Sequence, residues 1–556
     1  MKTERHSAAE LLKATSSHLR GTLAEELAGQ PDSFSKEASG LLKFHGVYQG
    51  DDRDLRKAGA GKVYSAMVRV SIPGGRITAG QYLALDRLAD TAGDGTLRIT
   101  SRQGLQYHRV GVGSLRGLIR AVNNAGLTTL AACGDVVRNV VCCAEPLPGE
   151  DRQDLWRYAK LLDRELKPET RAYAEIWLDG EKAVSFGPPA EEAEPLYGAT
   201  YLPRKFKIGF AFEGDNTTDI YTHDLGFVPH FEGGRLAGFT MLAGGGLGSS
   251  PGVKETHPRL ADSVAFLPPE DLPEAAKAVV AIHRDYGNRA NRKLARLKYV
   301  IEEQGLPWFK AELSARLGKP LLPPRPLVWR RQSDYLGWHG QAGGGWFFGL
   351  RVVSGRISGP MRAAIRQVAT DLAPDMRFTA QQNLILAGFD DLTRTLLDAI
   401  LREHGVAAPA EMPPVLRHSM ACPALPTCGL AVAEAERVLP GIVAEIQREL
   451  DQLGLGAETV HLRLTGCPNG CARPYTAEIG IVGQSPGLYA VYLGGSPAST
   501  RLARMFRDKV PQARLAEVLR PVFREYAWRR SPGESFGDYS NRVGVEALRG
   551  RREEAA

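Results

Sequence analysis

Four of the seven cysteines lie late in the chain and form two close pairs. Five residues separate Cys422 from Cys428, and three separate Cys467 from Cys471. Four thiolates that converge on one point can hold a cubane iron–sulfur cluster. Proline and glycine within both pairs favour tight loops whose backbone N–H groups can face sulfur. The spacing therefore predicts an iron–sulfur site.

Zinc binding and disulfide formation are the other uses of such cysteines. Structural zinc sites usually place two to four residues between paired cysteines, so the gap of five speaks against zinc. Disulfides need an oxidising compartment, and the N-terminus, MKTERHSAAELLK, has no apolar core of signal-peptide type. The Ala/Glu/Leu run after Cys428-Gly429 predicts a helix whose N-terminus would favour a thiolate.

A second group of residues is basic and lies in short apolar or glycine-rich segments. These segments are 67–69, 100–108, 134–139 and 202–207. Arg69 falls inside an apolar strand, and Lys205 and Lys207 are two residues apart in an extended segment, so they face the same side. Any one of these side chains alone reads as a surface charge. Together they indicate a site for a small anion or for a cofactor that carries carboxylates.

The elements that position these residues come from an internal repeat with a period of about 280 residues. Each copy has an apolar strand, a G-R-I-[TS] or equivalent turn, a helix, two short strands and another helix. The predicted elements are strands 63–72 and 347–353 and helices 81–90, 361–372, 115–125 and 392–403. Arg102 and His108 of the first copy are replaced by Gln381 and Ala387 in the second. We therefore expect a pseudo-twofold core in which one half binds the ligand and the other supports it.

The repeat predicts an α+β fold in which two half-domains form a pseudo-twofold core and two α/β domains complete the molecule. The predicted boundaries are an N-terminal arm at 1–60, half-domains at 61–130 and 336–405, one α/β domain at 131–330, and a second α/β domain with the four paired cysteines at 410–545. At 43% hydrophobic and 24% charged residues, the composition is that of a globular protein. No run approaches the roughly 18 apolar residues of a membrane helix. A net charge of +7 without a basic tail does not indicate nucleic acid binding. These features predict a cytoplasmic protein.

Three motifs and the ends of the chain carry a family resemblance. The motifs are the four cysteines, TSRQGLQYH at 100–108 and LPRKFK at 202–207, and the match extends from LRGT at 19–22 and KFHGVYQ at 43–49 to SFGDY at 535–539. With these, the chain resembles the sulfite and nitrite reductase family nearly end to end. The resemblance implies a siroheme and a [4Fe–4S] cluster that share one cysteine thiolate. It also implies that the duplicated half-domains are ferredoxin-like, that 131–330 is a siroheme and substrate domain, and that 410–545 is an iron–sulfur and siroheme domain.

The resemblance also implies residue roles. Cys422, Cys428, Cys467 and Cys471 would ligate the cluster, and Cys471 would also be the axial ligand of siroheme. Arg69, Arg138, Lys205 and Lys207 would bind substrate and donate protons. Arg102 would pair with siroheme carboxylates, with Gln106 and His108 nearby. Cys133, Cys142 and Cys143 are expected to be buried apolar thiols, although Cys133 lies five residues before Arg138.

The implied reaction is the six-electron reduction of sulfite to sulfide. The alternative is nitrite reduction, and Lys207 favours sulfite because nitrite reductases of this family tend to have Asn there. A zinc protein or plain electron carrier is a further alternative, which leaves the paired arginines and lysines unexplained. The glycine runs at 244–248 and 343–345 lack the G-x-G-x-x-G spacing of a dinucleotide site. We therefore expect electrons from a partner protein, either an NADPH-oxidising flavoprotein or ferredoxin. Residues 16–54 resemble those of the hemoproteins that pair with the flavoprotein, which favours that donor, and we expect the first 50 or so residues to help dock it.

Overall fold

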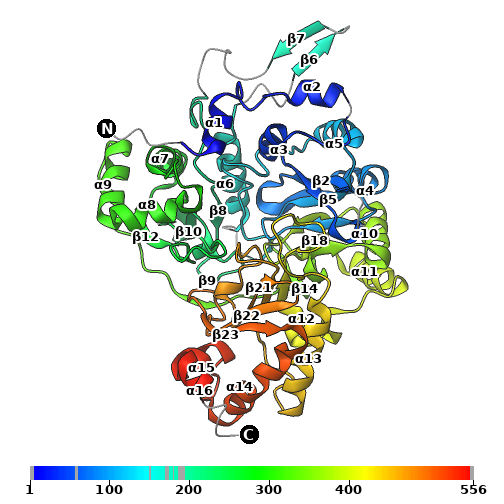
Figure 1. Cartoon of the computed structure of the whole chain (residues 1–556). Helices are drawn as coiled ribbons and strands as arrows, with labels where there is room; N and C mark the ends of the chain where they lie inside the picture. Colours follow the sequence, from blue (N-terminus) through cyan, green and yellow to red (C-terminus); the bar gives the residue numbers. More distant parts are fainter. Residues whose placement is uncertain are drawn as a thin grey trace.

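The computed structural model describes residues 6–29, 31–56, 61–148, 152–169, 175–178, 181–185 and 194–550. Figure 1 shows two half-domains on one side of the molecule (blue and yellow-green), a green domain on the other, and an orange-to-red domain below them. No helix within the described residues is long and apolar enough to cross a membrane.

The internal repeat is confirmed as two half-domains with the same element order. The first contains β2 (Tyr64–Val70), β3 (Arg76–Thr78), α4 (Ala79–Ala92), β4 (Leu97–Ile99), β5 (Leu105–Val110) and α5 (Val112–Asn124). The second contains β14 (Gly337–Gly340), β15 (Trp346–Leu350), β16 (Arg356–Ile357), α10 (Gly359–Asp371), β17 (Asp375–Phe378), β18 (Leu384–Phe389) and α11 (Asp391–Glu403).

The half-domains exchange a strand, which the sequence pattern does not reveal. The first sheet has the order β1-β2-β5-β4-β16, so it ends with a strand from the second half-domain. The second has the order β14-β15-β18-β17-β3 and ends with a strand from the first. Arg356 is opposite Arg98 in one sheet, and Ile77 is opposite Met376 in the other. Each sheet therefore depends on both halves of the chain.

Two glycines make this exchange possible. Gly75 and Gly355 occupy equivalent turns with φ of +75° and +74°. A Cβ at Gly75 would lie 2.3 Å from the Phe378 carbonyl oxygen, and one at Gly355 would lie 2.2 Å from the Ile99 carbonyl oxygen. A side chain at either position would push the exchanged strand away from its sheet, in addition to straining the backbone.

The green domain surrounds a sheet of order β12-β11-β10-β8. Its elements are α6 (Arg152–Glu165), β8 (Ile208–Phe210), β10 (Leu225–Glu232), β11 (Arg235–Ala243), β12 (Asp262–Leu267), α7 (Leu272–Tyr286), α8 (Leu297–Gln304) and α9 (Leu306–Leu317). β8 runs parallel to β10. The extended segment with Lys205 and Lys207 enters β8 directly and is thereby fixed to the core of this domain.

The C-terminal domain carries the four cysteines on a sheet of order β19-β20-β21-β22-β23. Its elements are α12 (Pro414–Arg417), β19 (Ser419–Ala421), α13 (Leu439–Gln452), β20 (Leu462–Thr465), β21 (Ile479–Ser485), β22 (Leu488–Leu493), β23 (Arg504–Pro511), α14 (Leu515–Arg529), α15 (Phe536–Val543) and α16 (Val545–Gly550). Together with the half-domains, this domain confirms the predicted fold class.

The predicted helix directly after Cys428 is wrong. The next helix, α13, begins only at Leu439, and residues 429–438 form turns and irregular chain. The N–H groups of Val432 and Ala433 both donate to the Gly466 carbonyl oxygen, and the Tyr489 hydroxyl donates to the Glu434 carbonyl oxygen. These contacts with the sheet override the helical preference of the segment. The Cys428 thiol therefore has no helix N-terminus beside it.

The N-terminal arm begins with α1 (Ala8–Ala14), α2 (Leu23–Ala28) and α3 (Lys36–Leu42) and ends in β1 (Val47–Asp51). The buried Lys13 Nζ donates to the Leu202 carbonyl oxygen at 2.7 Å, which anchors α1 on the green domain. β1 pairs with β2 along its whole length. Residues 47–51 are therefore an edge strand of the first sheet and part of the core.

Candidate active site

The two cysteine pairs lie in loops that leave the same edge of one sheet. Cys422 follows β19 and Cys467 follows β20, and these strands are parallel neighbours. Successive parallel strands bring their carboxyl ends to a common edge. The backbone N–H of Cys422 donates to the Leu464 carbonyl oxygen at 3.2 Å, which ties the first loop to the end of β20. The fold thus gathers four cysteines that are up to 49 positions apart in the chain.

Hydrogen-bond donors surround the cysteine sulfurs, as the loop composition predicts. The backbone N–H of Gly466 lies 3.3 Å from Cys422 Sγ, and the Asn469 side-chain amide lies 3.5 Å from Cys467 Sγ. The Leu430 backbone N–H is directed at the Cys428 sulfur. Donors of this kind stabilise sulfur that carries negative charge.

The electrostatics also reflect four thiols in close proximity. Burial, followed by the nearby Cys471, raises the pKa of Cys422 well above its ordinary value and that of Cys467 to about 11. Burial and Cys471 likewise raise the pKa of Cys428. Binding of a metal centre must therefore displace protons from these sulfurs. All seven cysteines of the chain are free thiols.

The arrangement does not fit a single zinc ion. Within the described residues, no three His, Cys, Asp or Glu side chains lie close enough together to bind one metal ion. In a cubane cluster each cysteine binds a different iron, so the sulfurs stay further apart than the ligands of one ion. Hydrogen-bond donors at three of the four sulfurs, those of Cys422, Cys428 and Cys467, also suit the thiolates of a [4Fe–4S] cluster.

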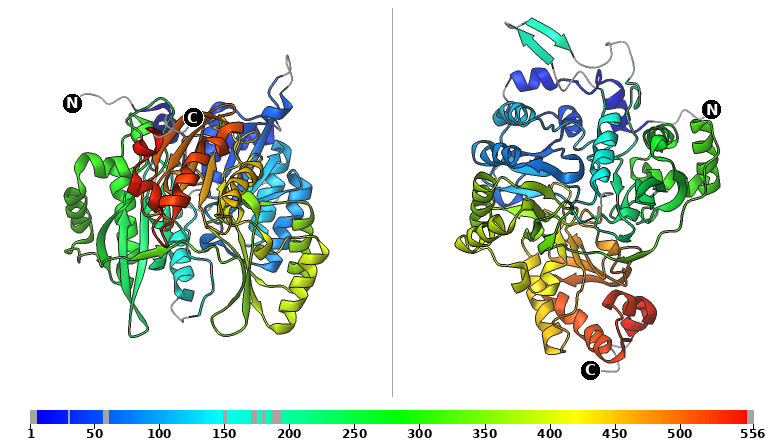
Figure 2. Two further views of the ribbon diagram at one scale, coloured as in Figure 1. Left: turned by 90° about the horizontal axis from the view of Figure 1, so that it is seen from below. Right: turned by 180° about the vertical axis from the view of Figure 1, so that it is seen from behind.

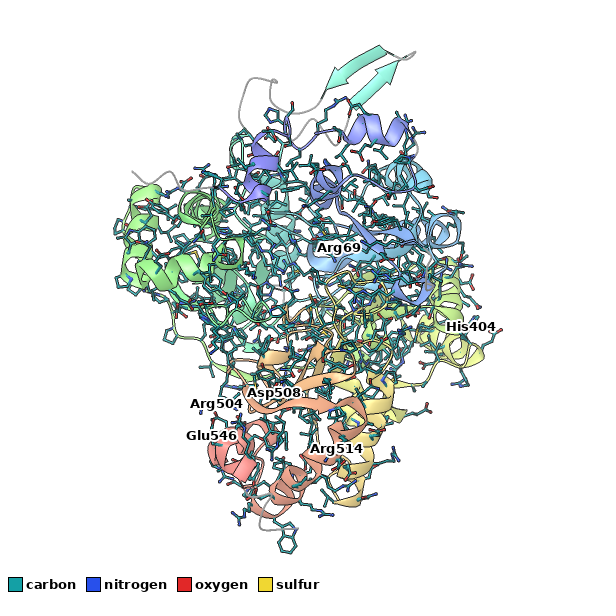
Figure 3. The ribbon with its side chains drawn as sticks, viewed as in Figure 1. Arg69, His404, Arg504, Asp508, Arg514 and Glu546 are labelled. Atoms are coloured by element: carbon teal, nitrogen blue, oxygen red, sulfur yellow. The ribbon has the colours of Figure 1, made fainter. Side chains whose placement is uncertain are left out.

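Near the exposed Cys471 lies Lys207, which belongs to a group of half-buried cations that we call the basic cluster. Its members are Arg69 on β2, Arg102 between β4 and β5, Arg138 in the loop before Val141, and Arg204, Lys205 and Lys207 before β8. None of the six forms an ion pair with a carboxylate in the part of the chain that the structure describes. Figure 3 shows Arg69 toward the middle of the molecule, in contrast to Arg504 and Arg514 on the C-terminal domain.

Burial and mutual repulsion lower the pKa values of Arg102 and Lys205 in the basic cluster. Burial, then Arg138 nearby, lowers the pKa of Arg102 to about 9. Burial and the adjacent Arg204 lower the pKa of Lys205 well below its ordinary value. Binding of an anion would relieve this repulsion and lower the free energy of the site.

Lys207 joins the basic cluster to the cysteine site. Burial, then Arg296 and Arg102, lower the pKa of Lys207 to about 7, and the nearby Cys471 sulfur opposes this shift. The Lys207 backbone N–H donates to Asp224 Oδ2 at 2.9 Å, and the Arg296 guanidinium binds both oxygens of the same buried carboxylate. These contacts fix the Lys207 backbone at the start of β8, within electrostatic reach of Cys471.

The predicted cofactor residues Gln106 and His108 have other contacts. With its amide oxygen turned toward Arg69, Gln106 accepts a hydrogen bond from Arg69 Nε at 3.0 Å. The buried His108 ring has Nδ1 3.3 Å from Arg356, and burial and Arg356 hold its pKa well below the usual range. Gln106 therefore orients Arg69, and a neutral His108 packs at the junction with the second half-domain. Contact of either with a cofactor stays a prediction.

Cys133 lies beside the basic cluster, as its sequence position suggests. Arg69 Nη1 approaches Cys133 Sγ to 2.8 Å. Cys142, by contrast, is buried in the core, and burial raises its pKa to about 12. Arg138 donates to the Gly134 carbonyl oxygen at 3.2 Å and contacts the Tyr48 hydroxyl.

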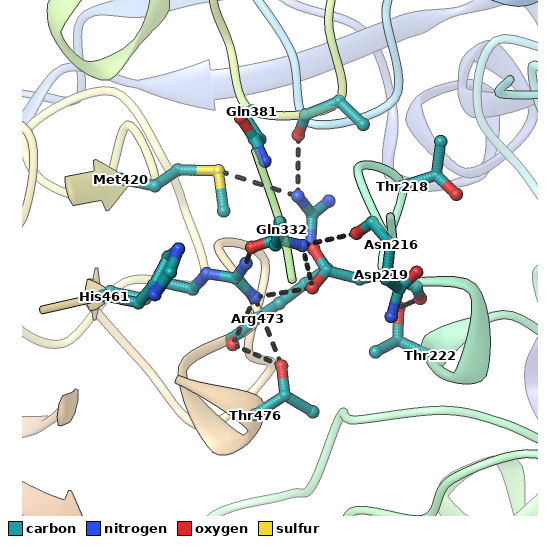
Figure 4. A network of polar contacts seen from close by, with 12 residues as sticks. Asn216, Thr218, Asp219, Thr222, Gln332, Gln381, Met420, His461, Arg473 and Thr476 are labelled. Carbon is teal, nitrogen blue, oxygen red and sulfur yellow. Dashed lines mark hydrogen bonds and ion pairs between the residues drawn. The ribbon is translucent and has the colours of Figure 1, made fainter. Parts of the chain in front are cut away.

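Sequence reasoning missed a buried network around Arg473, two residues after Cys471. Figure 4 shows Arg473 beside Asp219, Gln332 and Thr476. Its Nη1 donates to the Ser101 carbonyl oxygen at 3.1 Å, its Nη2 donates to the Ala380 carbonyl oxygen at 2.7 Å, and its Nε pairs with the fully buried Asp219. Both half-domains and the green domain thus converge on the loop that carries Cys471. In the sequence, the motif C-A-R-P at 471–474 was the signal that could have indicated this network.

The glycine-rich run at 244–248 supports the same loop. Ser249 N–H donates to the Pro468 carbonyl oxygen at 3.0 Å, and a Cβ at Gly248 would lie 3.3 Å from the Asn469 carbonyl oxygen. Lys298 Nζ donates to the Gly246 carbonyl oxygen at 3.0 Å. The glycines thus allow the backbone at 244–248 to pack closely against the loop that carries Cys467 and Cys471.

Comparison with known proteins agrees with this arrangement. The family model for the nitrite and sulphite reductase 4Fe-4S domain matches residues 158–321, and the model for the nitrite/sulfite reductase ferredoxin-like half domain matches residues 59–125 and 339–404. The half-domain matches coincide with the two units that exchange strands. The four paired cysteines lie outside the matched 4Fe-4S segment.

Full-length relatives have similar sequences and a similar fold. The chain is 44% identical to the sulfite reductase [NADPH] hemoprotein beta-component of Myxococcus xanthus, over 97% of this chain and 96% of that protein. It is 43% identical to the sulfite reductase [ferredoxin] of Synechococcus elongatus, over 98% and 90%. The solved NirA protein of Mycobacterium tuberculosis superimposes with a TM-score of 0.81, 26% identity and 98% coverage of both chains.

Proposed function

The chain belongs to the nitrite and sulfite reductase family of oxidoreductases, and we propose that it reduces sulfite to sulfide at a siroheme joined to a [4Fe–4S] cluster by the Cys471 thiolate. One observation carries the proposal: Lys207 of the basic cluster lies within electrostatic reach of the exposed Cys471. Anion binding and thiolate ligation therefore meet at one point, as reduction of an anion at a thiolate-bound iron requires.

The residues present suit both cofactors. Cys422, Cys428 and Cys467 would hold the cluster from its buried side, and Cys471 would reach both groups. Arg102 Nε is buried and has no hydrogen-bond partner among the described residues, which suits a siroheme carboxylate. When bound, the two groups supply six electrons, one at a time, to the substrate sulfur.

The basic cluster supplies charge and protons. Arginine keeps its charge at all working pH values and presents a planar fork, so Arg69 and Arg138 would hold the oxygens of sulfite. The pKa of Lys207 is lowered to about 7, so Lys207 can release a proton near neutral pH, and the pKa of Lys205 is lowered well below its ordinary value by burial and the adjacent Arg204. Three oxygens must leave as water, and each departure needs both a cation and protons.

We also propose that a partner protein supplies the electrons. The glycine-rich runs at 244–248 and 343–345 lack dinucleotide spacing, and the first of them packs against the cysteine loop. Among the relatives, the M. xanthus protein is named for NADPH and the S. elongatus protein for ferredoxin.

The test is an absorption spectrum of the purified holoprotein with iron and acid-labile sulfide counted. We expect a red-shifted tetrapyrrole spectrum with about five irons and about four sulfides per chain. Cys471→Ser should lose the joined siroheme and cluster. A colourless zinc protein after expression with adequate siroheme supply would refute the proposal, and a Cys471→Ser protein of normal colour and activity would refute the axial assignment.

A further inference from the structure

Cys428 is the cysteine through which the predicted cluster comes nearest to an apolar part of the surface. Cys422 and Cys467 are buried, and Cys471 faces the basic cluster. Cys428 is half-buried, and the two residues after it, Gly429 and Leu430, are exposed. The backbone N–H of Leu430 is directed at the Cys428 sulfur. A protein that touches Leu430 is therefore separated from a cluster ligand by one residue.

Leu430 belongs to an exposed group of apolar side chains that we call the apolar patch. Its members and their exposed fractions are Leu430 67%, Leu55 47%, Val63 42% and Tyr64 40%. Arg53 connects the two segments, because its Nη1 donates to the Ala431 carbonyl oxygen at 2.7 Å and its Nη2 to the Gly429 carbonyl oxygen at 3.0 Å. Figure 2 (left) shows a blue segment that rises from the molecule, and β1, which precedes Leu55 in the chain, is an edge strand of the first sheet. Exposed apolar groups of this kind mark interaction sites.

Charged side chains border the apolar patch in nearly equal numbers. Arg109 Nε pairs with Asp52 at 2.6 Å, Arg437 Nη1 pairs with Asp54 at 2.5 Å, and Arg56 pairs with Asp51. Glu434 also pairs with Arg437, and Lys62 adds one positive charge. An apolar centre with a polar rim is the usual anatomy of a protein interface. A strongly acidic carrier would need a rim of net positive charge, and this rim is close to neutral.

We propose that the apolar patch docks the flavin-bearing domain of an NADPH-oxidising flavoprotein, so that electrons enter the cluster at Cys428. This inference rests on the proposed function, which requires an electron donor. In each transfer the reduced flavin loses one electron and the cluster gains one, and six transfers reduce one sulfite. NADPH supplies the electrons to the flavoprotein. Electron transfer becomes slower with distance, which favours docking where a cluster ligand outside the substrate site, here the half-buried Cys428, lies near the surface.

Point variants test the docking, because deleting the N-terminal 50 residues would remove most of β1 and the Tyr48 contact with Arg138. We compare Leu55→Glu, Tyr64→Glu and Leu430→Glu with wild type in the holoenzyme. A charge at the centre of an apolar interface should raise the KM for the flavoprotein by about tenfold or more. Sulfite reduction driven by reduced methyl viologen, which needs no docking, should stay within about twofold of wild type.

Leu392→Glu on α11 is the matched control, because Leu392 is 70% exposed and lies in the second half-domain. It should leave both activities unchanged. Leu55→Glu and Tyr64→Glu are decisive because neither residue adjoins a cluster ligand. Normal flavoprotein-driven turnover in both would overturn the proposal. So would a defect confined to ferredoxin-driven turnover, since that outcome assigns the patch to ferredoxin. Wild type that fails to reduce sulfite with methyl viologen would instead refute the proposed function.

Discussion

Replacing Lys207 by methionine should stabilise the cofactor-free protein at low pH. Burial, Arg296 and Arg102 lower the pKa of Lys207 from an ordinary value of 10.5 to about 7. In the unfolded chain the same ammonium group is hydrated and keeps its ordinary pKa. Between these two pH values the folded chain binds fewer protons than the unfolded chain, so the stability of the wild type rises with pH. The destabilisation by Lys207 is complete below about pH 7 and has disappeared above about pH 10.5.

The size of the effect follows from the same shift. The difference in pKa corresponds to an upper limit of roughly 5 kcal/mol. Because the Lys207 side chain is only half-buried, solvent screens part of this cost, and we expect about 2–4 kcal/mol at pH 6.5. At pH 9.5 about a third of that difference should remain, because most Lys207 in the folded chain is then neutral.

Urea unfolding of the cofactor-free protein, followed by tryptophan fluorescence, measures this difference. Wild type and Lys207→Met are compared at pH 6.5 and 9.5, with the exposed Lys254→Met as control. Methionine can also change the packing, but that contribution does not depend on pH. A stability difference that is the same at both pH values, or one that Lys254→Met reproduces, would refute the reasoning.

Three further substitutions test separate parts of the site. Lys207→Asn should lower kcat/KM for sulfite at least about tenfold more than for nitrite with reduced methyl viologen, because sulfite carries more charge; equal losses would show that Lys207 does not set substrate choice. Arg473→Gln leaves the buried Asp219 without this partner, so it should lower the free energy of unfolding by about 3–5 kcal/mol. Arg473→Lys should recover part of this loss. A loss below about 1 kcal/mol in Arg473→Gln would contradict the role of the network. Gly245→Ala places a Cβ 2.2 Å from the Tyr221 carbonyl oxygen and should lower the free energy of unfolding, measured with urea, by about 1–3 kcal/mol. Gly117→Ala in α5, where the space around the Cβ is open, should not destabilise the protein. Equal effects of the two substitutions would contradict the packing argument.

The repeat was readable from sequence because each half-domain has its own alternation of strand and helix. The helices predicted at 81–90 and 361–372 correspond to α4 and α10. α4 extends two residues further at each end, and α10 begins two residues earlier and ends one residue earlier than predicted. Strand exchange was not readable, because β3 and β16 are only three and two residues long and their partners are some 300 and 260 positions away. Hydrophobic periodicity shows that a strand faces a core but not which sheet completes that core.

The residues of the site likewise include some that the sequence reveals and others that only the fold reveals. Arg69, Lys205 and Lys207 stood out because a cation inside an apolar segment needs a reason. The structure places them in one basic cluster, in which Lys207 lies near Cys471. Asp219 did not stand out, because an isolated aspartate in a loop is ordinary until its buried partner is known. Its ion pair with Arg473 spans more than 250 positions and exists only through the fold. Sequence types reveal charge in unusual surroundings, whereas pairs between distant segments require the packing.

The asymmetry between the halves explains how a duplicated core can carry one site. Arg102 and its counterpart Gln381 occupy equivalent turns, where the following residues, Gln103 and Gln382, both have positive φ. Gln381 is neutral, and its amide donates to the Ser333 carbonyl oxygen at 3.2 Å, so it can be buried without a counter-charge. Arg102 donates to the Ile208 carbonyl oxygen at 3.0 Å and keeps a net charge among other cations, which only an anion can offset. The copy with Gln381 therefore needs no counter-charge, and the copy with Arg102 keeps a positive charge that an anion would offset.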